Sequence, residues 1–212
     1  QALTVGVDRS LSMCEKFSSN WGVCADARAL PFASGSFDLV VSNAMLQWLS
    51  DDLAVVLSEV FRVLKPGGGF VFSSLGPDTL KEVRAAWAEV DTFEHTQTLI
   101  DLHTVGDHLR AQDFEPVVMD AWPVTLEFDS VHAVLADVRG VGANVVTSEN
   151  AHQGLMTPRK FKRFVQAYEA LFSTESGGVQ VHYEVFFGQA WKPLVASGEV
   201  GLAAVGRPSQ NG

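Results

Sequence analysis

The chain is poor in basic residues, in cysteine and in long apolar runs. Its 212 residues include 15 Lys and Arg against 25 Asp and Glu, which gives a net charge of −10. Nucleic acids and anionic membranes bind clustered basic side chains, so this balance argues against both as general partners. No apolar run reaches the roughly 18 residues that span a bilayer, and the first residues do not resemble a signal segment. A cytoplasmic protein is expected.

Residue types that build metal or nucleophile sites are also scarce or badly spaced. The two cysteines, Cys14 and Cys24, are too few for a disulfide framework or a four-ligand zinc site. The six histidines contain no H-E-x-x-H pair. No G-x-S-x-G motif is present. We therefore expect neither a metal centre nor a serine-type active site.

Short apolar runs alternate with helical patterns over the first part of the chain. Candidate strands cover 3–7, 21–25, 37–43 and 70–75, and helical patterns follow at 52–64 and 77–87. The breakers at 65–69, Lys-Pro-Gly-Gly-Gly, should end the first of these helices. Alternation of this kind predicts an α/β fold with a mostly parallel, Rossmann-like sheet and helices on both faces.

The later part of the chain changes character. Helices are expected at 103–113, 130–141 and 158–172, and strands at 116–128, interrupted at Pro123, and 179–191. Two helices between two long strands predict a helical insertion at about 129–178. We expect a single domain over 1–193 and a flexible tail over 194–212, because the tail is rich in small residues, Gly and Pro.

Polar residues end three of the candidate strands. Asp8, Asp26 and Asn43 each follow a short apolar run. Ligands of open α/β sheets bind beyond the carboxyl ends of the strands. A carboxylate in the place of Asp8 can accept hydrogen bonds from both hydroxyls of a ribose. The alternative for an isolated Asp is a helix cap or a turn.

The sequence segments around these residues resemble the cofactor-binding half of class I S-adenosylmethionine-dependent methyltransferases. VGVDRSLSM, DARALPF, FDLVVSNAMLQW and RVLKPGGGFVFS follow one another in the order of that family. The resemblance implies that Asp8 binds the ribose and that Asp26 and Ala27 contact the adenine. It also implies that Asn43 and Leu46 lie beside the methyl donor.

Sequence segments outside these shared motifs resemble a single, more specific family. SNAMLQWL, SSLGPDTLKEVRAAWAEVD, DVRGVGAN and HYEVFFGQAWKP are similar to malonyl-acyl-carrier-protein O-methyltransferases of biotin synthesis. The family's first strand and glycine-rich loop would precede Gln1. We therefore expect a longer natural protein or a degenerate copy, and weak activity from this chain alone. Three alternatives stay open: a methyltransferase for another small acid, a protein-arginine-modifying assembly factor of the same fold, and a non-catalytic remnant.

The reaction implied by this resemblance needs no general base, because the accepting carboxylate is already ionised at neutral pH. A cation that grips the carboxylate is expected instead, and Arg139, flanked by Gly140 and Gly142, is the best candidate. Its alternative is an ion pair with Asp137. Tyr183 could add a hydroxyl or could simply be a core aromatic residue.

Two further groups are candidates for substrate or partner binding. His95 and Gln97 match a segment of the same family and are substrate-pocket candidates. The helix predicted at 158–172 carries four basic residues in five positions: Arg159, Lys160, Lys162 and Arg163. A solvated helix face is one explanation of this cluster. The other is a docking surface for acyl carrier protein, an acidic partner.

Overall fold

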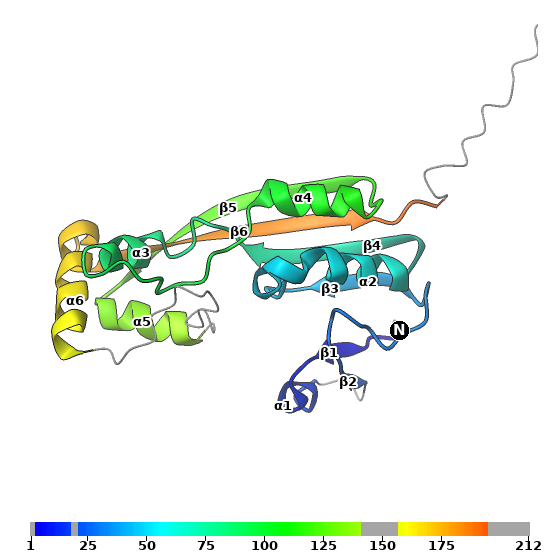
Figure 1. The fold of residues 1–212 in the computed structure, drawn as a ribbon, viewed down its shortest axis with the longest axis horizontal. Coiled ribbons are helices and arrows are strands. Elements are labelled where there is room, and N and C mark those ends of the chain that lie inside the picture. The colour runs from blue at the N-terminus through cyan, green and yellow to red at the C-terminus, as the bar shows by residue number, and fades with distance from the viewer. Residues whose placement is uncertain (1–2, 18–20, 141–156, 195–212) are drawn as a thin grey trace, which may run out of the picture.

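A computed structural model of the chain describes residues 3–17, 21–140 and 157–194 (Figure 1). The strands are β1 (Gly6–Asp8), β2 (Gly22–Cys24), β3 (Phe37–Ser42), β4 (Leu64–Leu75), β5 (Val117–Phe128) and β6 (Val179–Trp191). The helices are α1 (Leu11–Cys14), α2 (Leu53–Val63), α3 (Lys81–Ala88), α4 (Leu102–Ala111), α5 (Val131–Gly140) and α6 (Pro158–Phe172). Two 3-10 turns, η1 (Leu46–Trp48) and η2 (Ser50–Asp52), precede α2.

The strands form two sheets. β1 and β2 pair in parallel, and β3, β4, β6 and β5 follow one another in that order in a second sheet. Within this second sheet β3 and β4 are parallel, whereas β6 runs antiparallel to both β4 and β5. The α/β class is confirmed, but the expectation of a mostly parallel sheet is wrong for the described residues. Local patterns give strand positions without giving strand directions.

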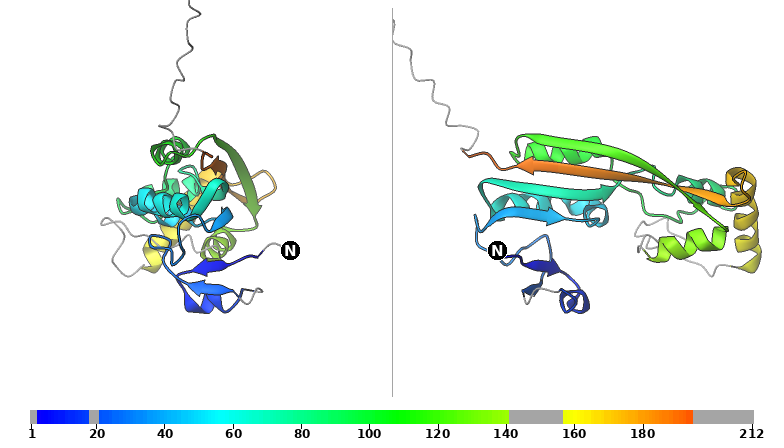
Figure 2. Two further views of the ribbon diagram at one scale, coloured as in Figure 1. Left: turned by 90° about the vertical axis from the view of Figure 1, so that its right-hand side faces the viewer. Right: turned by 180° about the vertical axis from the view of Figure 1, so that it is seen from behind.

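Helices pack on both faces of the larger sheet, but at different ends of it. The apolar stripe of α2, including Leu53, Val56 and Leu57, is buried against Phe70 and Phe72 of β4. Helices α2 and α4 lie on the same side of the strands in both views of Figure 2. At the far end of β5 and β6, a second core joins α3, α5 and α6 to the opposite face of the sheet (Figure 1).

Two predicted breaks in regular structure lie within strands. The glycine-rich segment at 65–69 follows the end of α2 and forms an irregularity in β4, where the register with β3 shifts and Gly67 has a φ of +79°. Pro123 does not interrupt β5 and pairs with Glu184 of β6. β5 is an edge strand, and an edge strand tolerates a residue without an N–H group.

Two other expectations concern membrane-spanning helices and the C-terminal tail. No helix in the described ranges is long and apolar enough to cross a membrane. The expected tail, apart from Leu194, lies outside the described residues.

Candidate functional site

The carboxyl ends of β1 and β2 lie next to each other, so Asp8 is beside the end of the strand that leads to Asp26. Asp8 pairs in register with Cys24, and the N–H of Ala25 donates to the Asp8 carbonyl at 3.0 Å. The Asp8 side chain is half-buried, and its Oδ1 accepts a hydrogen bond from the Ser10 N–H at 2.7 Å. The turn that follows β1 therefore holds the Asp8 carboxylate at the strand end.

Asp26 is tied to a neighbour that the sequence reading missed. Arg28 donates from Nε to Asp26 Oδ1 at 3.0 Å and from Nη2 to Oδ2 at 2.6 Å. Its third nitrogen donates to Asp52 at 2.8 Å. The hydrogen bonds from Arg28 hold the pKa of Asp26 well below its usual range. Arg28 thus links the loop after β2 to the turn before α2.

The same loop is fixed to α2 at a second place. Glu59 accepts from the Leu30 N–H at 2.7 Å, and Arg62 donates to the carbonyls of Leu30 and Phe32 at 2.9 and 2.6 Å. Glu59 and Arg62 also pair with each other at 2.7 Å. In the part of the chain that the structure describes, no strand ladder joins β1 to β3. Side-chain contacts therefore position the 26–32 loop against α2 and the turn before it, through Arg28, Glu59 and Arg62.

The loop after β3 holds Asn43 at the next strand end. The Oδ1 atom of Asn43 accepts from the Ser73 hydroxyl at 2.6 Å, and the N–H of Ala44 donates to the Ser73 carbonyl at 3.1 Å. Asn43 is exposed. The side chain of Leu46 is 0% exposed and packs in the core, and its place beside the methyl donor stays a prediction. Ala27 is half-buried and packs against the same core.

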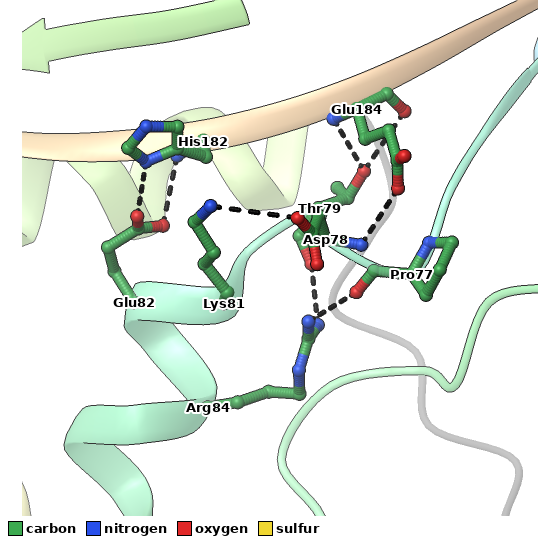
Figure 3. Close-up of polar contacts among 8 residues, drawn as sticks. All are labelled: Pro77, Asp78, Thr79, Lys81, Glu82, Arg84, His182 and Glu184. Atoms are coloured by element: carbon green, nitrogen blue, oxygen red, sulfur yellow. Dashed lines mark hydrogen bonds and ion pairs between the residues drawn. The ribbon is translucent and has the colours of Figure 1, made fainter. Parts of the chain in front are cut away.

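The Gly76–Arg84 segment is bound tightly to β6 (Figure 3). The N–H groups of Gly76 and Leu80 donate to the carbonyls of Glu184 and His182, both at 2.8 Å. Glu82, 1% exposed, accepts from the His182 N–H at 2.9 Å and also contacts its ring.

Further contacts hold the turn within this segment (Figure 3). The N–H of Asp78 donates to the Glu184 carboxylate at 3.0 Å. Arg84 donates to the carbonyls of Pro77 and Thr79, and burial lowers its pKa. This segment carries part of the resemblance to the family, but local sequence patterns predict no role for Glu82, Arg84 or His182.

A small pocket lies where η1, the end of β4 and this segment meet. Eight residues line it: Gln47, Trp48, Leu75, Thr79, Leu80, Thr96, Gln97 and Leu99. Gln97 is thus part of a pocket wall, as its prediction as a substrate-pocket residue requires.

His95 does not line this pocket. Its ring stacks on Trp87 with centroids 3.8 Å apart, and its Nε2 lies 2.8 Å from Asp91. The ring of His95 is thus buried and packed against Trp87, and its role in substrate binding stays a prediction.

Arg139 and Tyr183 have different surroundings. Arg139 is exposed in the last turn of α5, and its expected neighbour Gly142 lies outside the described residues. No ion pair of the described residues involves Arg139. Asp137 instead accepts a hydrogen bond from the Tyr183 hydroxyl at 2.7 Å. Tyr183 is buried in the second core, which raises its pKa, and its hydroxyl as a substrate ligand stays a prediction.

Two residues of the basic cluster on α6 form structural contacts, and the other two are exposed. Lys160 forms an ion pair with Asp91 at 2.9 Å, and Arg163 donates to the Glu89 carbonyl at 3.0 Å. Both contacts join α6 to the end of α3. Arg159 and Lys162 are exposed, and within the described ranges neither takes part in an ion pair. Helix α6 begins as predicted, with Thr157 capping the Lys160 N–H at 3.3 Å. Among the described residues no cluster of His, Cys, Asp and Glu could hold a metal ion.

Comparisons with known proteins agree with this arrangement. A family model described as a methyltransferase domain matches residues 2–72. Among solved structures, the YcgJ protein of Bacillus subtilis is similar with a TM-score of 0.57 at 17% identity, over 89% of this chain and 82% of that one. This likeness supports the Rossmann-like fold.

Curated relatives narrow the family. The malonyl-[acyl-carrier protein] O-methyltransferase of Laribacter hongkongensis is 43% identical over 81% of this chain and 56% of that protein. The protein of the same name from Legionella pneumophila is 33% identical over 95% of this chain and 72% of that protein. The chain spans a little over half the length of several relatives that it matches. By its identity to the Legionella protein over most of both chains, this chain belongs to the malonyl-[acyl-carrier protein] O-methyltransferase family.

Proposed function

We propose that the protein transfers a methyl group from S-adenosylmethionine to the free carboxylate of a malonyl thioester carried by acyl carrier protein. The observation that carries this proposal is the 33% identity to the Legionella enzyme over 72% of that protein. The strand-end residues add a physical reason. Asp8 is the last residue of β1, and Asp26 and Asn43 come after β2 and β3, at the carboxyl ends of strands, where ligands of α/β sheets bind.

The residues present fit the nucleoside part of this cofactor. Asp8 supplies a carboxylate that is held in place by Ser10 and is half-buried at the end of β1. A carboxylate in this position can accept both ribose hydroxyls. The loop at 26–32, pinned by Arg28 and Arg62, would border the adenine. When bound, S-adenosylmethionine supplies an activated methyl group on a positively charged sulfur.

The chain's own residues would act on the carboxylate by orientation. The carboxylate has a pKa of about 4 and is ionised at neutral pH, so no base is needed to activate it. Alignment of the reacting atoms and removal of water then supply most of the rate enhancement. Arg139 would hold the carboxylate through parallel hydrogen bonds. The exposure of Arg139 and its lack of an ion pair within the described residues support this role.

The exposed half of the basic cluster suits an acidic carrier. Because the protein carries a net charge of −10, an acidic partner needs a local positive surface to approach it. Arg159 and Lys162 provide that surface on α6. Lys160 and Arg163 hold α6 against the end of α3 and so set the position of that surface.

A matched pair of variants tests the proposal. The wild-type protein, Asp8→Asn and Asp107→Asn are incubated with methyl-labelled S-adenosylmethionine and a small malonyl thioester. We expect a base-labile methyl ester from the wild type and from Asp107→Asn, an exposed surface change. Asp8→Asn should raise the KM for S-adenosylmethionine roughly tenfold or more, because it removes a charged hydrogen-bond acceptor. Absence of labelled malonyl ester with the wild type would contradict the proposal.

A further inference from the structure

Both cysteines of the chain lie beside the strand end that carries Asp8. Cys14 is the last residue of α1, and Cys24 is the last residue of β2, where it pairs in register with Asp8 of β1. Cys14 is buried, whereas Cys24 is exposed. A reagent in solution can therefore reach one thiol of this pair more readily than the other.

The side chains of the two cysteines lie on the same side of the β1–β2 pair. A Cβ atom added to Gly22 would meet the carbonyl oxygen of Cys14 at 2.6 Å, so Gly22 points toward α1. Side chains alternate along a strand, and Cys24 is two residues after Gly22. The Cys24 side chain therefore points toward α1 as well.

The two sulfur atoms contact the backbone of consecutive residues. Cys14 Sγ donates to the Asp8 carbonyl at 3.3 Å, and Cys24 Sγ donates to the Arg9 carbonyl at 3.4 Å. Cys14 Sγ also lies 3.4 Å from the carbonyl of Val23, the residue before Cys24. Burial raises the pKa of the Cys14 thiol, and the nearby Cys24 thiol raises it further. The thiols are thus close neighbours at the end of β1.

We propose that Cys14 and Cys24 form a reversible disulfide on reaction with an oxidised thiol such as glutathione disulfide, and that this disulfide weakens the binding of S-adenosylmethionine. The effect on binding rests on the proposed function, in which Asp8 accepts the ribose hydroxyls. In a reducing cytoplasm, disulfides of this kind are transient and respond to oxidants.

The reaction proceeds by two thiol–disulfide exchanges. The exposed Cys24, as its thiolate, attacks one sulfur of glutathione disulfide, and one glutathione leaves. Cys14 then loses its proton and attacks the Cys24 sulfur of this mixed disulfide, which forms the Cys14–Cys24 bond and releases the second glutathione. The two thiol protons end on the two glutathione molecules. The cysteine pair is oxidised by two electrons, and glutathione disulfide is reduced by the same number.

Closure of the disulfide should disturb the turn that holds Asp8. It removes both S–H groups, so their hydrogen bonds to the backbone carbonyls are lost, and it draws the sulfur atoms to about 2.05 Å. The N–H of Cys14 donates to the Ser10 carbonyl at 3.0 Å, and the Ser10 N–H donates to the Asp8 carboxylate at 2.7 Å. A shift of Cys14 is therefore passed through Ser10 to the carboxylate proposed to bind the ribose.

Peptide mapping tests the disulfide without any ligand. Trypsin cleaves after Lys and Arg, which places Cys14 on peptide 10–16 and Cys24 on peptide 17–28. The wild type is equilibrated with glutathione disulfide, its free thiols are blocked, and the digest is analysed by mass spectrometry. The two peptides should appear joined, and a dithiol reductant should separate them. Glutathione on Cys24 without the joined peptide would overturn the proposal.

Calorimetric titration of S-adenosylmethionine tests the consequence. Oxidation should raise the Kd of the wild type about tenfold, the effect of weakening one hydrogen bond to a charged group, and reduction should restore it. Cys24→Ser should bind equally with and without oxidant. Cys14→Ser can carry glutathione on Cys24 but cannot close the disulfide, so oxidant should leave its Kd unchanged too.

Two negative results have different meanings. A joined peptide with an unchanged Kd in the oxidised wild type would overturn the effect on cofactor binding and leave the proposed function intact. Failure of the reduced wild type to bind S-adenosylmethionine would refute the proposed function together with that effect, whereas the joined peptide would report on the disulfide alone.

Discussion

The hydroxyl of Tyr183 on β6 donates a 2.7 Å hydrogen bond to the carboxylate of Asp137 on α5. This bond joins the last strand to the helix that carries Arg139. It predicts that Tyr183→Phe lowers the free energy of unfolding by about 1.5–3 kcal/mol, the range for a hydrogen bond to a charged acceptor. Chemical denaturation measures this change. A variant with unchanged stability and a raised KM for the thioester would show that Tyr183 binds substrate instead.

Titration of Asp91 should make the free energy of unfolding depend on pH in the acid range. Burial raises its pKa, but hydrogen bonds from His95 and Lys160 outweigh that effect and bring the pKa from 3.8 to about 2. A lowered folded-state pKa contributes stability above the unfolded-state value, and this contribution is lost as the pH falls. The free energy of unfolding attributable to Asp91 should therefore decline between about pH 4 and pH 2.

Asp91→Asn tests this expectation against a matched control. The variant should be less stable than the wild type at pH 7, and the difference should shrink toward pH 2. Asp107→Asn removes the carboxylate of an exposed pair with Arg110 and should change stability little at either pH. A gap between Asp91→Asn and the wild type that is the same at both pH values would rule out titration of Asp91.

The contacts of Arg62 should support cofactor affinity. Lys cannot reproduce the planar set of donors that reaches both Glu59 and the carbonyls of the 30–32 loop. Arg62→Lys should raise the Kd for S-adenosylmethionine about tenfold while leaving thioester affinity near wild type. Calorimetric titration of both ligands measures the split. Equal losses for both would indicate a general loss of folding rather than a misplaced loop.

Charge reversal on α6 should affect only the carrier-bound substrate. Arg159→Glu combined with Lys162→Glu should raise the KM for malonyl-acyl carrier protein about tenfold, because electrostatic attraction speeds association. The effect should diminish at high salt, where the charges are screened. A small malonyl thioester should react normally. Arg110→Glu on α4 is the control, and a similar loss with it would refute a specific docking surface.

Local patterns in the sequence predicted most of the helices and strands. They did not predict the directions of the strands or which strand lies at the edge of the sheet. The apolar stripe of α2 and the Thr157-Pro158 start of α6 are confirmed, because helix periodicity and capping act over a few residues. The expected break at Pro123 is wrong because the position of β5 at the sheet edge depends on distant strands. Edge position cannot be read from the neighbours of a proline.

In the candidate site too, local features could be predicted from the sequence and long-range contacts could not. Asp8, Asp26 and Asn43 could be placed at strand ends from the sequence, since each follows an apolar run. Contacts across long stretches of chain could not be foreseen. Glu82 and His182 are 100 residues apart, and Lys160 reaches Asp91 across 69 residues. The ion pair of Lys160 depends on the packing of α6 against the end of α3, which local sequence patterns do not specify.

The most direct test of the account compares malonyl-acyl carrier protein with acetyl-acyl carrier protein as methyl acceptors. The two substrates differ in the free carboxylate, and mass spectrometry locates a transferred methyl group on the acyl chain or on the carrier. The account predicts one methyl ester on the malonyl group and no transfer to the acetyl form. Methylation of the acetyl form, or of an arginine of the carrier protein, would contradict it.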